Sequence, residues 1–173
     1  MPIPSFDANG NLPVGNLFAA GAHHPLVPAS LQEVHERFVV QVPDSSRRSR
    51  IWQGWMRHRR ELEQVGIRYA TLVDGSFATT KQEPGDVDLC ILYDAAEVNA
   101  LGTTDRETLL RLLGGPACKP GYLCDVYGLS MHPLGDPRFS TTLERFAYWM
   151  RVFGTDRQDR QKSFLLVNER GVL

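Results

Sequence analysis

The stretch Asp74-Gly-Ser-Phe-Ala-Thr-Thr-Lys-Gln-Glu-Pro-Gly-Asp-Val-Asp88 lies between two short apolar runs, Tyr69–Val73 and Leu89–Tyr93. Both runs are rich in β-branched or aromatic residues, and this pattern predicts two buried strands. Between them, Gly75-Ser76 lets an anionic group approach the backbone, and Phe77–Lys81 predicts a short helix whose free N–H groups face that anion. The stretch therefore predicts a strand, an anion-binding turn and a second strand.

Asp86 and Asp88 stand two positions apart at the start of the second predicted strand. Successive side chains of a strand point to opposite faces, so both carboxylates emerge on the same face. Two like charges held so close repel each other unless a cation lies between them, and Mg²⁺ prefers carboxylate oxygens together with substrate phosphates. The pair therefore favours a metal–nucleotide site. The alternative is a simple strand–turn–strand unit with two solvated aspartates at its mouth.

Gly75-Ser76 followed by Asp86-Val-Asp88-Leu89 resembles the motif of the polymerase-β-like nucleotidyltransferase superfamily. The longer string from Asp74 to Asp88, together with the opening Phe6-Asp-Ala-Asn-Gly-Asn-Leu-Pro13, is similar to a group of small bacterial proteins within that superfamily. The core motif covers about fifteen residues, and the likeness to the smaller group spans roughly the first half of the chain. The resemblance implies an α+β fold and a metal-dependent transfer of nucleotides.

A third carboxylate completes the metal site in that superfamily, on a strand beside the one that carries the first two. Asp125 is the best candidate, because it lies among apolar residues in the predicted strand Gly121–Leu129. A lone carboxylate in such a run is costly unless it is paired or binds a metal ion. The alternative is an edge-strand aspartate that faces water.

A long helix is predicted from about Ser46 to Gln64, ended by Gly66, with a buried stripe of Ile51, Trp55, Leu62 and Val65. Six arginines lie on it, and they could line a groove for a triphosphate or a nucleic acid, because guanidinium groups bind phosphate through two hydrogen bonds. The alternative is a solvated helix face balanced by acidic residues. The arginines are Arg47, Arg48, Arg50, Arg57, Arg59 and Arg60.

The remaining pattern predicts one small mixed sheet that carries the carboxylates at one end, with helices packed on one face. Capping boxes at Ser30–Glu33 and Thr104–Glu107 open two further helices, and Thr141–Phe153 predicts another. Ser163–Val167 predicts a last strand. Asp7–Asn11 predicts a tight turn, since the later glutamate of a calcium-binding EF-hand loop is missing.

Composition limits the class of protein. A length of 173 residues, with 42% hydrophobic and 23% charged residues, predicts a single domain over residues 1–173 with an irregular segment at 1–30. The net charge of -1 gives no general attraction to nucleic acid or membranes, and no apolar run is long enough to span a bilayer. Three cysteines and no export signal predict a cytoplasmic protein.

The expected activity is a Mg²⁺- or Mn²⁺-dependent transfer of a nucleoside monophosphate from a nucleoside triphosphate to a hydroxyl of a protein or RNA, with release of pyrophosphate. In this expectation Gly75 and Ser76 hold the β- and γ-phosphates, and positive charge comes from Lys81, Arg47 and Arg48. Asp86 and Asp88 hold the nucleotide's metal ion, and Asp125 completes a second site.

Two other kinds of function remain open at this point. Relatives in the superfamily serve in toxin–antitoxin and phage-defence pairs, which implies a cognate toxin or effector protein as a partner. One alternative is therefore a binding module, antitoxin-like or regulatory, that keeps the fold without catalysis. The other is a hydrolase or phosphotransferase that uses the same carboxylates.

Overall fold

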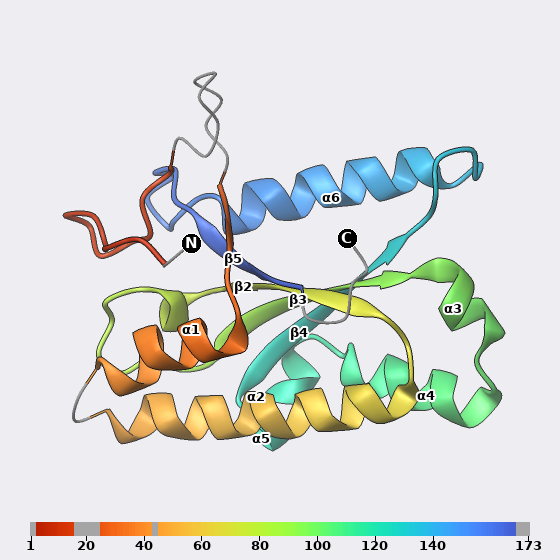
Figure 1. Cartoon of the computed structure of the whole chain (residues 1–173), viewed down its shortest axis with the longest axis horizontal. Coiled ribbons are helices and arrows are strands. Elements are labelled where there is room, and N and C mark those ends of the chain that lie inside the picture. Colours follow the sequence, from red (N-terminus) through yellow and green to blue (C-terminus); the bar gives the residue numbers. More distant parts are fainter. Residues whose placement is uncertain (1–2, 16–24, 43–44, 169–173) are drawn as a thin grey trace.

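A single five-stranded sheet forms the centre of the protein (Figure 1). The structure, a computed structural model, describes residues 3–15, 25–42 and 45–168. In spatial order the strands are β1 (Leu26–Pro28), β5 (Phe164–Val167), β2 (Tyr69–Asp74), β3 (Val87–Asp94) and β4 (Cys124–Met131).

The sheet is mixed, as the sequence predicted. Strand β2 runs antiparallel to both of its neighbours, β3 and β5, whereas β4 runs parallel to β3 and β1 runs parallel to β5. The register places Asp88 opposite Asp74 on one side and opposite Asp125 on the other. An α+β fold with a mixed sheet is therefore confirmed.

Helices cover both faces of the sheet, which corrects the prediction that they pack on one face. Figure 1 shows α6 (Phe139–Phe153) on one side, with α2 (Ser46–Val65) and α4 (Thr103–Leu112) on the other. The physical reason is that β3 is apolar at successive positions. Leu89 and Ile91 join the hydrophobic cluster with α2, and Cys90 and Leu92 join the cluster with α6, so each face needs a cover.

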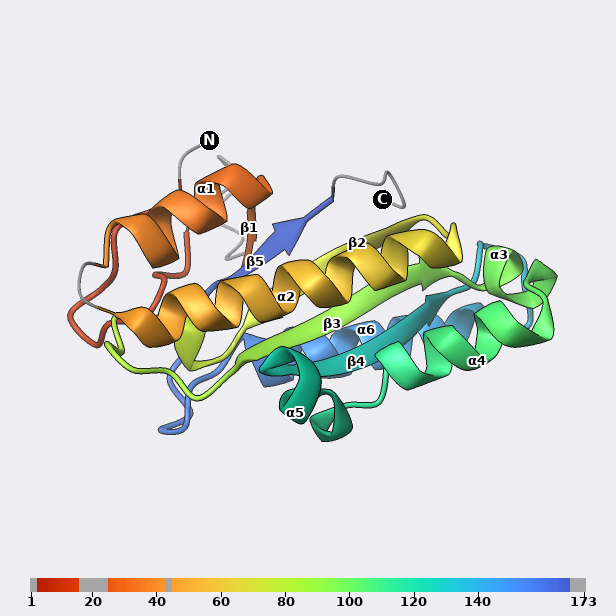
Figure 2. The ribbon, with the colours of Figure 1, turned by 90° about the horizontal axis from the view of Figure 1, so that it is seen from below.

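Helix α2 is the longest element and follows the predicted boundaries closely. The Ser45 hydroxyl accepts a hydrogen bond from the Arg48 N–H at 3.2 Å, and Gly66 ends the helix in the left-handed conformation at φ 82°. The predicted stripe of Ile51, Trp55, Leu62 and Val65 is buried. Figure 2 shows α2 extended across the sheet, with α4 and the short α5 (Lys119–Tyr122) beside it.

Several other element boundaries differ from the prediction. The capping box at Ser30 is confirmed, but the helix it opens is α1 (Leu31–His35), which continues as a π-helical turn over Glu36–Val40. Helix α4 begins at Thr103 with Gly102 as its N-cap, so the predicted capping box at Thr104 is wrong. A short α3 (Ala95–Ala100) follows Asp94.

The strand predicted at Gly121–Leu129 begins later, at Cys124, because a 3₁₀ turn over Pro116–Cys118 and α5 occupy the residues before it. Strand β1 was not predicted, because three residues within a proline-rich segment give no periodic signal. The tight turn at Asp7–Asn11 is present, with the Gly10 N–H donating to the Asp7 carbonyl at 3.0 Å. None of the helices in the described ranges has the length and apolar character that crossing a bilayer requires.

Candidate active site

Four carboxylates meet where β2 ends and where β3 and β4 begin. Asp74 is the last residue of β2, Asp86 directly precedes β3, and Asp88 and Asp125 lie on β3 and β4. Residues paired in register on adjacent strands share one face of the sheet, so the side chains of Asp74, Asp88 and Asp125 leave that face together. The structure therefore brings together the three aspartates that the sequence singled out and adds a fourth.

Lys119, the first residue of α5, lies between two of these carboxylates. Its Nζ is 2.9 Å from Asp86 Oδ2 and 3.1 Å from Asp125 Oδ2. Hydrogen bonds to Asp86 and then to Asp125 raise the pKa of the Lys119 ammonium group above its ordinary value, so it is charged at neutral pH. One positive charge thus links the carboxylate that precedes β3 to the carboxylate on β4.

Asp88 has no such partner. Burial raises its pKa to about 6, and the charges of Asp86, Asp74 and Asp125 act in the same direction. Within the described ranges, no hydrogen bond or ion pair to the Asp88 carboxylate is found. Like charges crowded in this way favour the binding of a cation.

Asp125 is also incompletely satisfied. Only 7% of the residue is exposed, and its Oδ1 accepts no hydrogen bond of ordinary geometry in the described part of the chain. The phenol of Tyr127 lies near this carboxylate. Burial, and then the charge of Asp125, raise the pKa of that phenol. Such an atom is costly to bury unless a donor or a cation reaches it.

Crowding of the carboxylates gives a testable pH dependence for Asp88→Asn. The raised pKa of Asp88 means that its contribution to stability is fully present below about pH 4, the unfolded value, and is lost as pH rises through about 6. In EDTA, the Asp88→Asn variant should therefore gain more in melting temperature over the natural protein at pH 7.5 than at pH 5. Calorimetry at both pH values measures this, and an equal gain at both would contradict the crowding.

Asp74 is neutralised by Lys162, the second residue before β5. Both are buried, and the Lys162 ammonium forms an ion pair with Asp74 Oδ1. Burial raises the pKa of Asp74, whereas Lys162 and the Gly75 N–H act in the opposite direction. The segment that leads into the last strand therefore supplies the counter-charge for the carboxylate at the end of β2.

The Gly75-Ser76 turn lies directly against Asp88. Gly75 has φ 82° and ψ -171°, a conformation reserved almost entirely for glycine, and a Cβ added there would lie 2.1 Å from Asp88 Oδ2. The helix predicted over Phe77–Lys81 is shorter and begins earlier, as a single 3₁₀ turn at Ser76–Ala78. Its length corrects the prediction, because Thr79 is already extended.

A cleft of about 720 Å³ opens beside this turn. Roughly 300–1,000 Å³ is usual for small-molecule sites. Of the residues predicted for the site, five line the cleft, whereas Asp125 does not line it and is joined to Asp86 through Lys119. The five are Gly75, Ser76, Lys81, Asp86 and Asp88.

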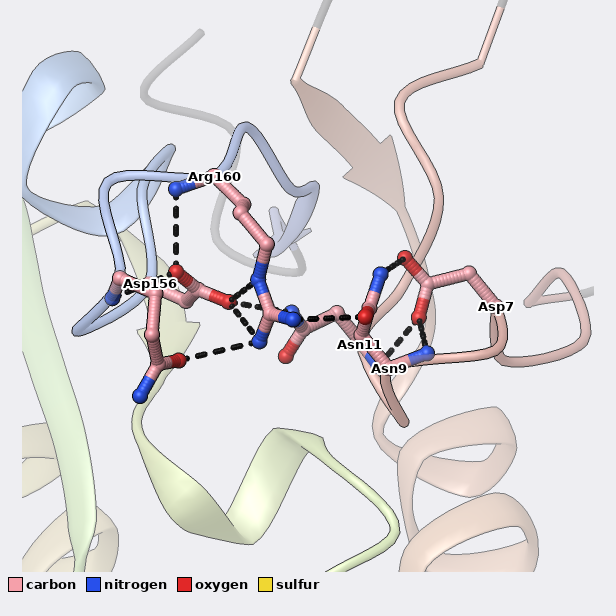
Figure 3. Close-up of polar contacts among 6 residues, drawn as sticks. Asp7, Asn9, Asn11, Asp156 and Arg160 are labelled. Carbon is pink, nitrogen blue, oxygen red and sulfur yellow. Dashed lines mark hydrogen bonds and ion pairs between the residues drawn. The ribbon is translucent and has the colours of Figure 1, made fainter.

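The N-terminal loop and the loop between α6 and β5 also line the cleft, and Figure 3 shows the polar contacts that join these two loops. Arg160 donates to Asp156 Oδ2 at 2.7 Å and to Asn9 Oδ1 at 2.6 Å, and Asn11 donates to Asp156 Oδ2 at 3.0 Å. The hydrogen bond from Arg160 holds the pKa of Asp156 well below its usual range. Arg157 lines the cleft from the loop between α6 and β5, so this loop also brings positive charge to it.

Arg47 and Arg48 do not line the cleft. Arg48 is fully buried and donates to the backbone carbonyls of Phe77, Thr79 and Lys81 at 2.6–2.8 Å, as well as to Phe38. Arg47 donates to the Pro84 and Gly85 carbonyls. Both guanidinium groups are therefore occupied in bracing the loop between Ser76 and Asp86, and they do not supply the charge to the cleft that the sequence predicted.

The donor set is suited to a hard divalent cation. Carboxylate oxygens are the ligands that Mg²⁺ and Mn²⁺ prefer, and Asp88, which is crowded by other carboxylates and has no ion-pair partner of its own among the described residues, fits a bound cation. Across the described residues, no group of three or more His, Cys, Asp or Glu side chains is arranged as a ready metal site. At this site the Lys119 ammonium lies between Asp86 and Asp125.

Comparison with known proteins gives one match. The model of a family described as "Family of unknown function (DUF6932)" matches residues 4–168. The chain belongs to the DUF6932 family. No curated protein and no solved structure matches it.

Sequence reasoning missed several residues of this DUF6932 site, above all Lys119 and Lys162. Lys162 is 88 positions from Asp74, and Lys119 is 33 positions from Asp86. Only Asp125, six positions after Lys119, is near its partner in the sequence. A signal was nevertheless present in the composition. The chain has sixteen arginines and only three lysines, Lys81, Lys119 and Lys162, and all three lie at this site.

Proposed function

We propose that this protein transfers a nucleoside monophosphate from a nucleoside triphosphate to a hydroxyl group of a protein or RNA acceptor, with release of pyrophosphate. The observation that carries the proposal is the meeting of Asp86, Asp88 and Asp125 beside the Gly75-Ser76 turn. The resemblance of this segment to the polymerase-β-like nucleotidyltransferase motif supports it. The volume of the cleft, about 720 Å³, is suited to a nucleotide.

Each wall of the cleft has a separate task in this reaction. Gly75 lets the Asp88 carboxylate approach the backbone of the turn that lines the cleft, and Lys81 offers a positive charge to the phosphates from the same loop. Arg157 lines the same cleft from the loop between α6 and β5, whereas the Arg160 guanidinium is paired with Asp156. The triphosphate is therefore held between the charges of Lys81 and Arg157, which orients its α-phosphorus for attack.

Asp86 and Asp88 would hold Mg²⁺ or Mn²⁺, since they line the cleft beside the glycine turn. A bound ion of this kind neutralises phosphate charge and so favours departure of pyrophosphate. Asp125 acts from behind, because it fixes Lys119 and through it Asp86. The acceptor oxygen forms a bond to the α-phosphorus as the bond to the β-phosphate breaks, and the hydroxyl proton is released.

The cellular setting belongs to the proposal as well. The net charge of -1 suits a protein acceptor or a docked RNA end better than a polymerase that moves along nucleic acid. Cys90, Cys118 and Cys124 are all free and buried, which supports a reducing cytoplasm. We place the activity in a toxin–antitoxin or phage-defence system, with a cognate toxin or effector as partner.

Label transfer tests the proposal directly. The full chain is incubated with α-³²P-labelled nucleoside triphosphates, Mg²⁺ and cell lysate, and the protein and RNA fractions are separated. We expect label in one fraction and equimolar pyrophosphate, with both lost in Asp88→Asn and retained in Asp105→Asn, an exposed carboxylate on α4. Release of orthophosphate without label transfer would instead identify a hydrolase or phosphotransferase.

One observation favours the binding-module alternative, namely that Lys119 already neutralises part of the carboxylate group. A non-catalytic module predicts no label in either fraction. It also predicts that capture of a partner protein is unaffected by Asp88→Asn. The natural protein and the Asp88→Asn variant therefore distinguish the enzyme from the binding module in one set of experiments.

A further inference from the structure

The backbone segment that leads to Lys119 is fixed against β4, and from there the side chain, which is 42% exposed, reaches two carboxylates. The Gly115 N–H donates to the Val126 carbonyl at 2.7 Å, and the Val126 N–H donates back to Gly115 at 3.3 Å. This bridge fixes the segment before α5 against β4, one residue from Asp125. The position of this backbone segment therefore places the Lys119 ammonium near the carboxylates.

The net charge of the four carboxylates and their two ammonium partners can be balanced by one divalent ion. Asp74, Asp86, Asp88 and Asp125 form a group of four carboxylates, and the described residues supply two ammonium groups in ion pairs with them, Lys119 and Lys162. Two negative charges remain uncompensated. Because charges in a partly buried site must be balanced, one divalent cation completes the balance before any nucleotide enters.

We propose that Lys119 takes the place of the second metal ion, so that the site binds a single divalent cation, at Asp86 and Asp88. This inference rests on the proposed nucleotidyl transfer and specifies how many metal ions its site binds. The ammonium group is a compact point charge, and it occupies the position between Asp86 and Asp125 that a second ion would need. A second cation at Asp125 would face the ammonium at close range and be repelled.

The choice of lysine is consistent with this role. Arginine is more than five times as frequent in the chain, yet both of the described residues that form ion pairs with the four carboxylates are lysines. A planar guanidinium spreads its charge over several atoms, whereas an ammonium concentrates it at one position, as a metal ion does. The fixed ammonium also holds Asp86 and Asp125 together before a nucleotide binds.

Metal stoichiometry tests the inference without any measurement of transfer. The full chain is titrated with Mn²⁺, and free Mn²⁺ is followed by electron paramagnetic resonance. We expect one bound Mn²⁺ per chain in the natural protein, two in Lys119→Ala, and one in both Lys119→Arg and Arg68→Ala. Arg68 is the matched control, because it also links two carboxylates, Asp94 and Glu97, but does so outside the cleft.

The outcomes separate the inference from the proposed function. Two Mn²⁺ ions in the natural protein, or no change in number in a folded Lys119→Ala, overturn the inference alone. Absence of Mn²⁺ binding, or binding that persists unchanged in Asp88→Asn, overturns both. The number of Mn²⁺ ions bound by the natural protein tests the inference even where the Lys119→Ala variant fails to fold.

Discussion

Lys162→Met is expected to destabilise the folded protein by about 3–5 kcal/mol at pH 7, because it leaves the buried Asp74 carboxylate without its counter-charge. Methionine keeps most of the volume of the side chain, so the loss reports the charge and not a cavity. Urea-induced unfolding measures the effect. The deficit should shrink at low pH, because burial raises the pKa of Asp74 and the carboxyl group then takes up a proton.

Two control proteins make this result specific. Lys81→Met removes a lysine from the same cleft at an exposed position, and we expect a change within about 0.5 kcal/mol. Combining Lys162→Met with Asp74→Asn should recover much of the loss, since the buried charge is then gone. A Lys162→Met protein as stable as Lys81→Met would show that the ion pair is not needed.

Gly75→Ala is expected to lower the proposed nucleotidyl transfer at least ~100-fold, because displacement of a reacting group by about 1 Å can have an effect of that size. The new Cβ would lie 2.1 Å from Asp88 Oδ2, so the carboxylate or the turn must move. The backbone conformation adds a cost to folding of about 1–3 kcal/mol. Label transfer at a temperature where the variant is fully folded measures the catalytic part.

Gly66 offers the matched control for this substitution. It has the same φ of 82° at the end of α2, but a Cβ there meets no atom within 4 Å. Gly66→Ala should therefore lose some stability and keep its transfer rate. Equal transfer rates in the two variants would mean that the close approach of Gly75 to Asp88 is unimportant for activity.

Local signals predicted much of this fold. Helix α2 was placed within a residue or two, since Ser45 and Gly66 mark its ends through their own backbone and side-chain chemistry. Strands β2 and β3 followed from two apolar runs. The neighbourhood of Asp88 and Asp125 was anticipated from the resemblance to the nucleotidyltransferase motif, which implies a third carboxylate on the adjacent strand.

What the sequence could not provide is the partner of each charge. Arg48 looked like a phosphate ligand from its position on an amphipathic helix, but its guanidinium finds the carbonyls of a loop some thirty residues away. Lys119 and Lys162 reach their carboxylates only after the chain has folded. Both faces of the sheet are covered because α6 packs on the face away from α2, and no local pattern in the sequence specifies on which face a helix packs.

The ion pair between Asp74 and Lys162 also bears on how the protein is made. The two residues are 88 positions apart, so on a ribosome the hairpin of β2 and β3 emerges several seconds before its lysine, at about 5–20 residues per second. We expect the hairpin to stay open to water during this interval, since closing it would bury a bare charge. A nascent chain that stops short of residue 162 should therefore remain a substrate for proteases, and only finished chains should acquire a working cleft.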